Sequence, residues 1–150
     1  MKNLSLLLVL VFMICLEVQA QVEYKIITSV ESIVSSGLGR SRLVSASEDR
    51  NYRDFTSSRS DEEDERNKSD RGEIRVKNFE ETKLLNFYNI GGIRFQNIAA
   101  NDAVVSSKLS TMAEEGWELA FVTSAVESDA GKDDGQGIFI TRYVFKRNKS

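Results

Sequence analysis

Only one segment of this chain has the apolar spacing of an amphipathic helix. In residues 101–116, NDAVVSSKLSTMAEEG, the side chains of Val105, Leu109 and Met112 recur at i, i+4 and i+7. This spacing places all three on one face of a helix. Because a helix stripe must be buried against another layer, the rest of the chain has to supply that layer.

Both ends of this helix carry terminal signals. Asn97 or Asn101 is suited to cap the first turn, and Asp102 suits that turn because carboxylates favour helix N-termini. Gly116 suits the left-handed residue that follows many helices. We therefore predict a helix that ends at this glycine.

Strand-like patterns occupy most of the remaining chain. In the first of them the side chains on one face are all apolar or β-branched: Val22, Tyr24, Ile26, Thr28 and Val30. In the segment 117–128, the same alternation places Trp117, Leu119, Phe121 and Thr123 on one face. The predicted strands cover residues 22–34, 40–45, 82–90, 117–128 and 138–147. The fold class is therefore α+β, an antiparallel sheet of about four to five strands with one helix packed on one face.

The first 20 residues have the pattern of a secretory signal peptide. Lys2 is followed by an apolar run from Leu4 to Leu16 that only Ser5 interrupts, and small or modest residues precede Ala20. The run of 13 residues is shorter than the roughly 20 that a membrane span needs. We predict cleavage after Ala20 and a single periplasmic or secreted domain over residues 21–150, with no stable membrane span.

Composition removes several classes of function. Cys15 belongs to the signal, and the chain has no histidine and no proline. Cysteine nucleophiles, Cys/His zinc sites and Ser-His pairs are therefore excluded after cleavage. The formal net charge of −3 gives no basic field for nucleic acid. We expect a protein that is not an enzyme and has no cofactor.

A highly charged segment divides the strand patterns. Residues 56–73 contain SSRSDEEDERNKSDRGE, which is dense in both charge signs and has no aromatic residue. Such a segment cannot bury enough apolar surface to offset its ordering entropy. We predict a mobile charged loop here; an arm that folds on a partner is the alternative.

The single tryptophan directly follows the helix-ending glycine. Trp117 opens a strand, so its ring can fold back over the end of the helix stripe near Met112. Burial of an aromatic ring at this point would fix the angle between helix and strand. We predict a structural role; the alternative is a stacking platform for a sugar or another flat ligand.

The same residues carry a family resemblance. The stretch MAEEGWELAFVTS and the later RYVFKR resemble the bacterial family called domain of unknown function 4177, whose first strand also matches Tyr24-Lys25-Ile26. The chain is also similar to uncharacterised secreted proteins of the Bacteroidota across VESIVSSGLGRSR and AVESDAGKDDGQGIFITR. Residues 35–100 depart from the short family pattern as a long insertion. The resemblance implies a fold but no catalytic residue.

Two loops offer candidate ligand sites. In SGLGRSR, Gly37 and Gly39 precede Arg40 and Arg42, which suits an anion pocket because guanidinium groups bind carboxylate or phosphate bidentately. A plain hairpin turn with solvated or salt-bridged arginines is the alternative. In ESDAGKDDGQG, the carboxylates of Asp129, Asp133 and Asp134 could hold calcium. Their spacing does not match the twelve-residue calcium loop, and a soluble hairpin tip is the alternative.

The predicted strands are apolar on both faces, although one helix can cover only one. Either residues 84–98 fold over the second face or a second chain does. We therefore expect an exported, non-catalytic interaction or small-ligand-binding domain, whose partner is a second copy or an envelope protein. The alternatives are a homo-oligomeric structural envelope protein and a small glycan-acting enzyme that uses Glu114, Glu115 or Glu118.

Overall fold

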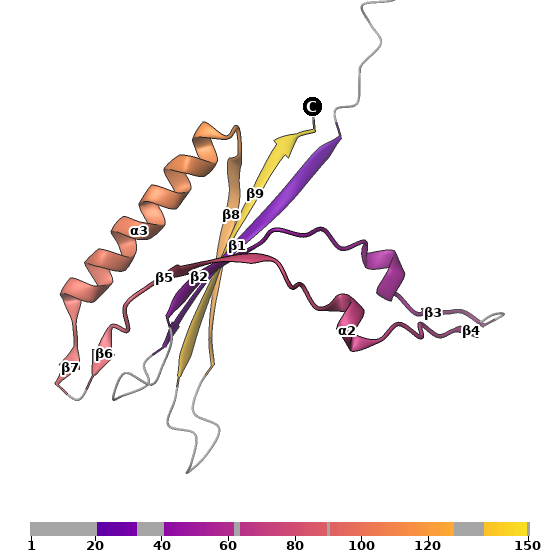
Figure 1. The fold of residues 1–150 in the computed structure, drawn as a ribbon, viewed down its shortest axis with the longest axis horizontal. Coiled ribbons are helices and arrows are strands. Elements are labelled where there is room, and N and C mark those ends of the chain that lie inside the picture. Colours follow the sequence, from indigo (N-terminus) through magenta and orange to yellow (C-terminus); the bar gives the residue numbers. More distant parts are fainter. Residues whose placement is uncertain (1–20, 33–40, 62–63, 90, 128–136, 150) are drawn as a thin grey trace, which may run out of the picture.

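Five strands form one antiparallel sheet, and a long helix lies on one side of it (Figure 1). The computed structural model describes residues 21–32, 41–61, 64–89, 91–127 and 137–149. The sheet order is β5-β2-β1-β9-β8. The predicted α+β fold is therefore confirmed. The main elements are β1 Val22–Ser32, β2 Arg42–Ala46, β5 Phe79–Lys83, α3 Phe95–Glu114, β8 Glu118–Glu127 and β9 Ile138–Asn148.

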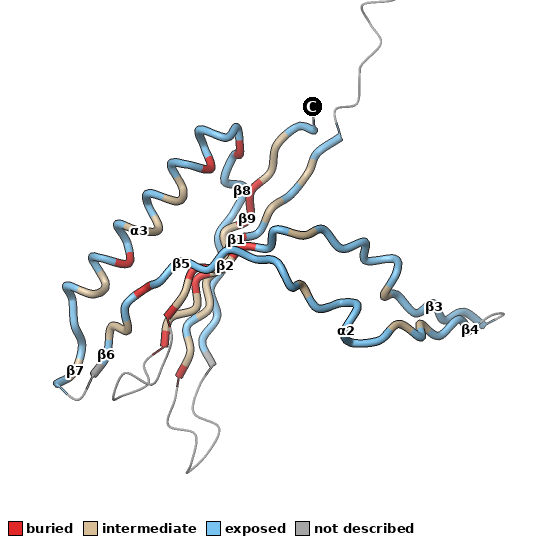
Figure 2. The backbone as a smooth tube through the Cα atoms, viewed as in Figure 1, coloured by how far each residue is buried: buried red, intermediate tan, exposed pale blue. Residues whose placement is uncertain are grey.

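The chain between β2 and β5 leaves the sheet as an arm, residues 47–78. Figure 1 shows the arm projecting on the side of the sheet opposite to α3. It contains the short elements η2 Tyr52–Phe55, β3 Ser58–Arg59, β4 Asp64–Glu65 and α2 Arg71–Ile74. None of its described residues is buried, as Figure 2 also shows. The predicted mobile loop, residues 56–73, lies in this arm, and its mobility stays a prediction.

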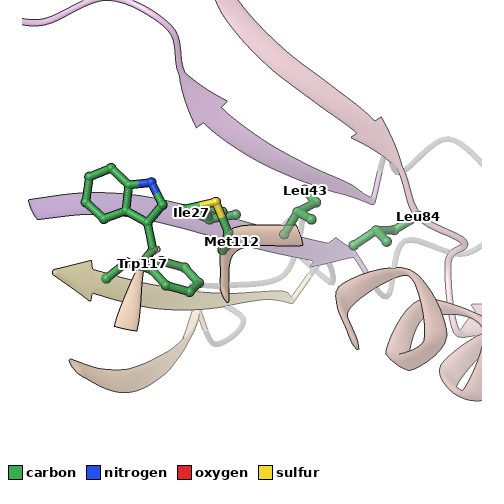
Figure 3. Packing of buried hydrophobic residues seen from close by; sticks show 6 residues of the cluster. Ile27, Leu43, Leu84, Met112 and Trp117 are labelled. Carbon is green, nitrogen blue, oxygen red and sulfur yellow. The ribbon is translucent and has the colours of Figure 1, made fainter. Parts of the chain in front are cut away.

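The core lies between α3 and one face of the sheet, here called the helix face. Its buried cluster takes side chains from four of the main elements and two connections: Ile27, Leu43, Leu84, Met112, Trp117 and Phe145. Figure 3 shows Met112 beside Ile27, with Trp117 at one end of the cluster and Leu84 at the other. Side chains alternate along β1, so Ile27 and Ser29 point to the helix face. The opposite face is called the open face.

The helix begins earlier than the sequence predicts. Its first residue is Phe95 and its N-cap is Arg94, which makes no side-chain capping hydrogen bond. The prediction that Asn97 or Asn101 caps the helix, with Asp102 in its first turn, is therefore wrong. Both asparagines lie within the helix and bind the preceding connection: Asn101 contacts the backbone of Leu85 and Asn97 that of Asn86.

The same contacts explain why the predicted strand 82–90 is wrong. The strand that the structure contains here is β5, which begins before the predicted strand and ends at Lys83. Leu84 then turns into the core, and the side chain of Asn101 satisfies both the amide and the carbonyl of Leu85 at 2.8 Å. The connection continues through the two-residue pair β6 Tyr88–Asn89 and β7 Gly92–Ile93. The apolar residues that follow β5 therefore do not continue this strand, and the first of them, Leu84, packs in the core under the helix.

The helix ends in a Schellman motif at Gly116. The Trp117 amide donates to the Met112 carbonyl at 2.9 Å, and the Gly116 amide donates to the Ala113 carbonyl at 3.0 Å. These two bonds are the ones that define the motif. Gly116 has φ of 82°, the left-handed conformation that the sequence predicts for it. The motif reverses the chain within one residue and sends Trp117 back against the helix end.

We expect Gly116→Ala to lower the free energy of unfolding by about 1 kcal/mol, because an L side chain is strained in the left-handed region. An added Cβ would meet nothing within 4 Å, so a steric clash does not add to this cost. Gly72→Ala in α2 is the matched control, since it also meets nothing within 4 Å but has no positive φ. Urea denaturation of both variants tests the expectation; equal stability would contradict it.

A β-bulge at Ala120 changes which β8 side chains share a face. Leu119 pairs with Phe145, but Phe121 pairs with the next residue of β9, Val144. Neighbouring residues of β9 point to opposite faces, so Leu119 lies on the helix face and Phe121 on the open face. The prediction that these two residues share one face is wrong, because strict alternation fails where one strand carries an extra residue.

Candidate binding surface

The predicted anion pocket is described only at Arg42. Gly37, Gly39 and Arg40 lie outside the described residues. Arg42 belongs to β2, where its Nε donates to the Glu81 carboxylate at 2.5 Å and its Nη1 donates to the Ser41 carbonyl at 2.7 Å. Its guanidinium is therefore already engaged by a neighbouring strand, and an incoming anion would compete with Glu81.

The predicted calcium ligands Asp129, Asp133 and Asp134 also lie outside the described residues. Over the ranges that the structure describes, no cluster of three or more acidic side chains has the geometry of a metal site. The calcium site therefore stays a prediction from the sequence.

Trp117 lies in the core and not on a ligand-facing surface. It is 9% exposed, and the guanidinium carbon of Arg147 sits 4.2 Å from the ring centroid. Arg147 is held there by the Glu23 carboxylate and by the Glu115 carbonyl. One side of the ring therefore faces the core cluster and the other is occupied by a cation, which leaves no open ring face for a sugar to stack on.

The helix stripe contributes to the same core. Met112 is fully buried, Leu109 packs against the buried cluster, and Val105 is half-buried. Val104 also packs against the cluster, although it was not among the residues predicted for the stripe. It lies eight residues before Met112, so a wider stripe at i, i+4 and i+8 would have identified it.

A hollow of about 250 Å³ near Trp117 bears on the glycan-acting alternative. It is lined by Val22, Gly116, Glu118, Lys146, Arg147 and Asn148. Glu118 is the only carboxylate among these described residues, and it pairs with Lys146 at 3.4 Å. Glycoside hydrolysis ordinarily needs two carboxyl groups about the scissile bond. The hollow therefore offers no such pair within the described part of the chain.

A second hollow, of about 450 Å³, separates α3 from strands β2 and β5. It is lined by Leu43 and Thr82 from the sheet and by Val104 and Lys108 from the helix, among others. The Lys108 Nζ donates to the Glu80 carboxylate at 2.9 Å, which bridges helix and sheet and holds the pKa of Glu80 below its ordinary value. The helix is therefore tied to β5 by an ion pair beside this hollow, while Leu43 of β2 remains part of the buried cluster.

The open face carries an uncharged row that crosses all five strands. The pairing register, continued by one position beyond Ile27 and Ser45 between β1 and β2, aligns one side chain from each strand in the order Phe79, Ala46, Ile26, Val144 and Phe121. Ile26 is 49% exposed, Phe79 52% and Phe121 57%. We call these five residues the apolar row. Tyr24 and Val22 extend it along β1, with 65% and 47% exposure.

The segment that was expected to cover this face packs elsewhere. Leu84 belongs to the core under α3, and Phe87 contacts Phe139 on the helix face with ring centroids 5.5 Å apart. The first alternative for the second face, coverage by residues 84–98, is therefore wrong. Among the described residues, Phe79, Ile26 and Phe121 of the row stay about half-exposed, whereas Val144 in its middle is buried at 8% exposure.

Charged residues border the row. The register places four basic residues on the open face, Arg42, Lys83, Arg142 and Lys146, against two acidic ones with described side chains, Glu81 and Glu118. Glu81 pairs with Arg42 and Glu118 pairs with Lys146. No described carboxylate pairs with Arg142. Among the residues whose side chains are described, basic residues therefore outnumber acidic ones on the open face.

The base of the arm adds a wall to this surface. Val76 and Phe79 stand beside Ile26, Thr28 and Val44 and enclose a hollow of about 330 Å³. Figure 1 shows the arm leaving the sheet here, on the open side. The candidate surface is therefore an apolar floor with one wall and a basic border.

Comparisons with known proteins give no further identification. No protein-family model, no curated protein and no solved structure matches the chain. The resemblance to domain of unknown function 4177 accordingly rests on the residues quoted for it. Across the described ranges, no helix has both the length and the apolar content that crossing a bilayer requires.

Proposed function

We propose that the chain is an exported, non-catalytic binding domain whose open face holds a protein partner of the cell envelope. The apolar row carries this proposal. Its half-exposed phenylalanine and isoleucine side chains lie on both sides of the buried Val144, and grouped exposed apolar side chains of this kind mark interaction sites. The signal-like residues 1–20 support export to the periplasm or beyond.

The chemistry of the face favours a particular kind of partner. Burial of the exposed halves of Ile26, Phe79 and Phe121 would contribute roughly 3 kcal/mol in total. Arg142 lies two residues from Val144 on the same face of β9, and no described carboxylate pairs with it. A partner segment with apolar residues and at least one carboxylate would satisfy both features. A free small anion could bind the basic residues at the border, but it would leave the apolar row exposed to water.

Native mass spectrometry of residues 21–150, purified gently from the envelope of the producing cell, tests this proposal. We expect a bound species whose mass is not a multiple of the chain mass. In Ile26→Lys the bound fraction should fall at least about tenfold, since a charge in the centre of an apolar interface must be desolvated.

Ile93→Lys is the matched control, because Ile93 is 53% exposed and lies in β7, away from the open face. This variant should keep the bound species. Equal loss in both variants, or retention in Ile26→Lys, would show that the open face is not the binding surface. A wild-type chain with nothing bound would contradict the proposed function itself.

A further inference from the structure

The outer edge of the sheet at β8 is long, uncharged and exposed. Within the part of the chain that the structure describes, β9 is the only strand that pairs with β8. Every residue from Glu118 to Val126 is exposed, and residues 119–126, LAFVTSAV, include no charge, proline or glycine. The outward backbone amides and carbonyls of such a strand are a template for another strand.

The other edge of the same sheet is protected in the usual way. β5 has only five residues, FEETK, of which three are charged. Its chain continues into the arm at one end and into the core at the other, so it offers little free backbone. Charged side chains and short length are the ordinary means by which proteins prevent edge pairing. The contrast indicates that the β8 edge is left open for an interaction.

Side chains on both faces of β8 are also unprotected. Val122 and Val126 point to the helix face with 47% and 54% exposure, and Phe121 points to the open face with 57%. A strand that pairs here must therefore be apolar on both of its faces. The described part of this chain contains one exposed strand of that kind, which is β8 itself.

The bulge defines how two such strands would align. Regular alternation holds from Phe121 to Glu127, because the irregularity at Ala120 interrupts the ladder on one side and the strand ends on the other. The midpoint of this regular segment is Ser124. An antiparallel pairing about Ser124 sets Val122 opposite Val126 of the second copy, which is a favourable β-branched pair. Residues 121–126 carry no charge, so no like charges oppose each other within this segment.

We propose that two copies of this chain join through their β8 strands, antiparallel about Ser124, into one continuous ten-stranded sheet. The two-fold axis of such a pairing is perpendicular to the sheet, so both α3 helices lie on one side and both open faces on the other. This inference concerns a different surface from the proposed function and holds whether or not the open face binds a partner.

Cysteine cross-linking tests the pairing, since residues 21–150 contain no cysteine. Cα atoms opposite each other in an antiparallel pair are about 4.5–5.5 Å apart, which is within the range of a disulfide. In Ser124→Cys, mild oxidation should therefore give at least about ten times more covalent dimer than in the control Ser110→Cys. Ser110 is also an exposed serine, and it lies on α3.

A second measurement covers the case in which the cysteine variant folds poorly. Val122→Lys/Val126→Lys places charges on the exposed helix-face side of the edge, so native mass spectrometry should show monomers where the wild type shows dimers, while the far-UV circular dichroism spectrum keeps the signal of the folded chain. Dimers that persist in this variant would overturn the proposal. So would a disulfide-linked dimer in Ile26→Cys but not in Ser124→Cys, which would locate the contact on the open face.

The test separates this inference from the proposed function. Ile26→Lys should keep the β8 dimer while it loses the envelope partner. A wild-type chain that is monomeric but still carries a bound envelope protein would overturn the dimer and leave the proposed function standing. A wild-type dimer that carries no other bound species would support the β8 pairing and contradict the proposed function.

Discussion

Replacement of Trp117 with alanine should lower the free energy of unfolding by about 3–5 kcal/mol, the usual cost of removing a buried aromatic side chain. The ring is 9% exposed and forms one end of the core cluster with Met112 and Phe145. Its loss would also leave Arg147 without the ring that its guanidinium covers at 4.2 Å. Because small domains have only about 5–15 kcal/mol of stability, this variant should be partly unfolded at moderate temperature.

Urea denaturation followed by circular dichroism measures this effect. Phe95→Ala is the matched control, because Phe95 is the first residue of α3 and is 76% exposed. We expect it to change stability by less than about 0.5 kcal/mol. If Trp117→Ala were equally mild, the ring would not be a structural element, and the stacking role set aside above would have to be reconsidered.

Asn101→Ala should cost about 3 kcal/mol, which is large for a polar residue. Asn101 is 3% exposed, although it lies in the middle of the helix. Its Oδ1 accepts from the Leu85 amide and its Nδ2 donates to the Leu85 carbonyl, both at 2.8 Å, with a longer bond to Glu31 at 3.3 Å. Alanine would leave both backbone groups of Leu85 unsatisfied in a partly buried place, at about 1–3 kcal/mol each.

Asn97→Ala provides the comparison, since Asn97 makes one such bond, to the Asn86 carbonyl at 2.7 Å, and is only half-buried. Its cost should be about 1 kcal/mol. Hydrogen exchange of the Leu85 amide gives an independent measurement, because this amide should lose protection in Asn101→Ala and keep it in Asn97→Ala. Equal costs and equal protection would show that Asn101 does not fasten the connection to the helix.

The helix shows both what the sequence could predict and what it could not. Its stripe and its end at Gly116 depend on neighbouring residues, through apolar spacing and the left-handed preference of glycine. The start of the helix cannot be predicted from such local signals. The first residue is Phe95, and the N-cap residue before it makes no side-chain capping hydrogen bond. Asn97 and Asn101 look like local caps in the sequence, but their partners are backbone groups of the preceding connection. Tertiary contacts therefore decide this boundary.

The candidate surface was harder to predict than the fold. Alternation along β1 correctly separates Tyr24 and Ile26 from Ile27, but it does not say which set the helix covers. The helix covers Ile27 and Ser29, so the more apolar set is the one left exposed. The apolar row also needs the register between strands and the bulge at Ala120, which are long-range properties. Sequence reasoning instead selected glycine-rich loops, because their residue types suggest ligands directly.

The junction between sheet and arm has a consequence for how such a chain can change over time. Ala46 and Phe79 are directly paired where the arm begins and ends, so the hairpin is clamped at its base. A connection about eight times longer than a tight turn raises the entropic free-energy cost of closing the loop by only roughly 2 kcal/mol. Lineages can therefore lengthen, shorten or exchange the arm while the strands beneath keep their alignment. Changes in the arm can therefore alter which partners the open face binds while the pairing of the sheet strands stays the same.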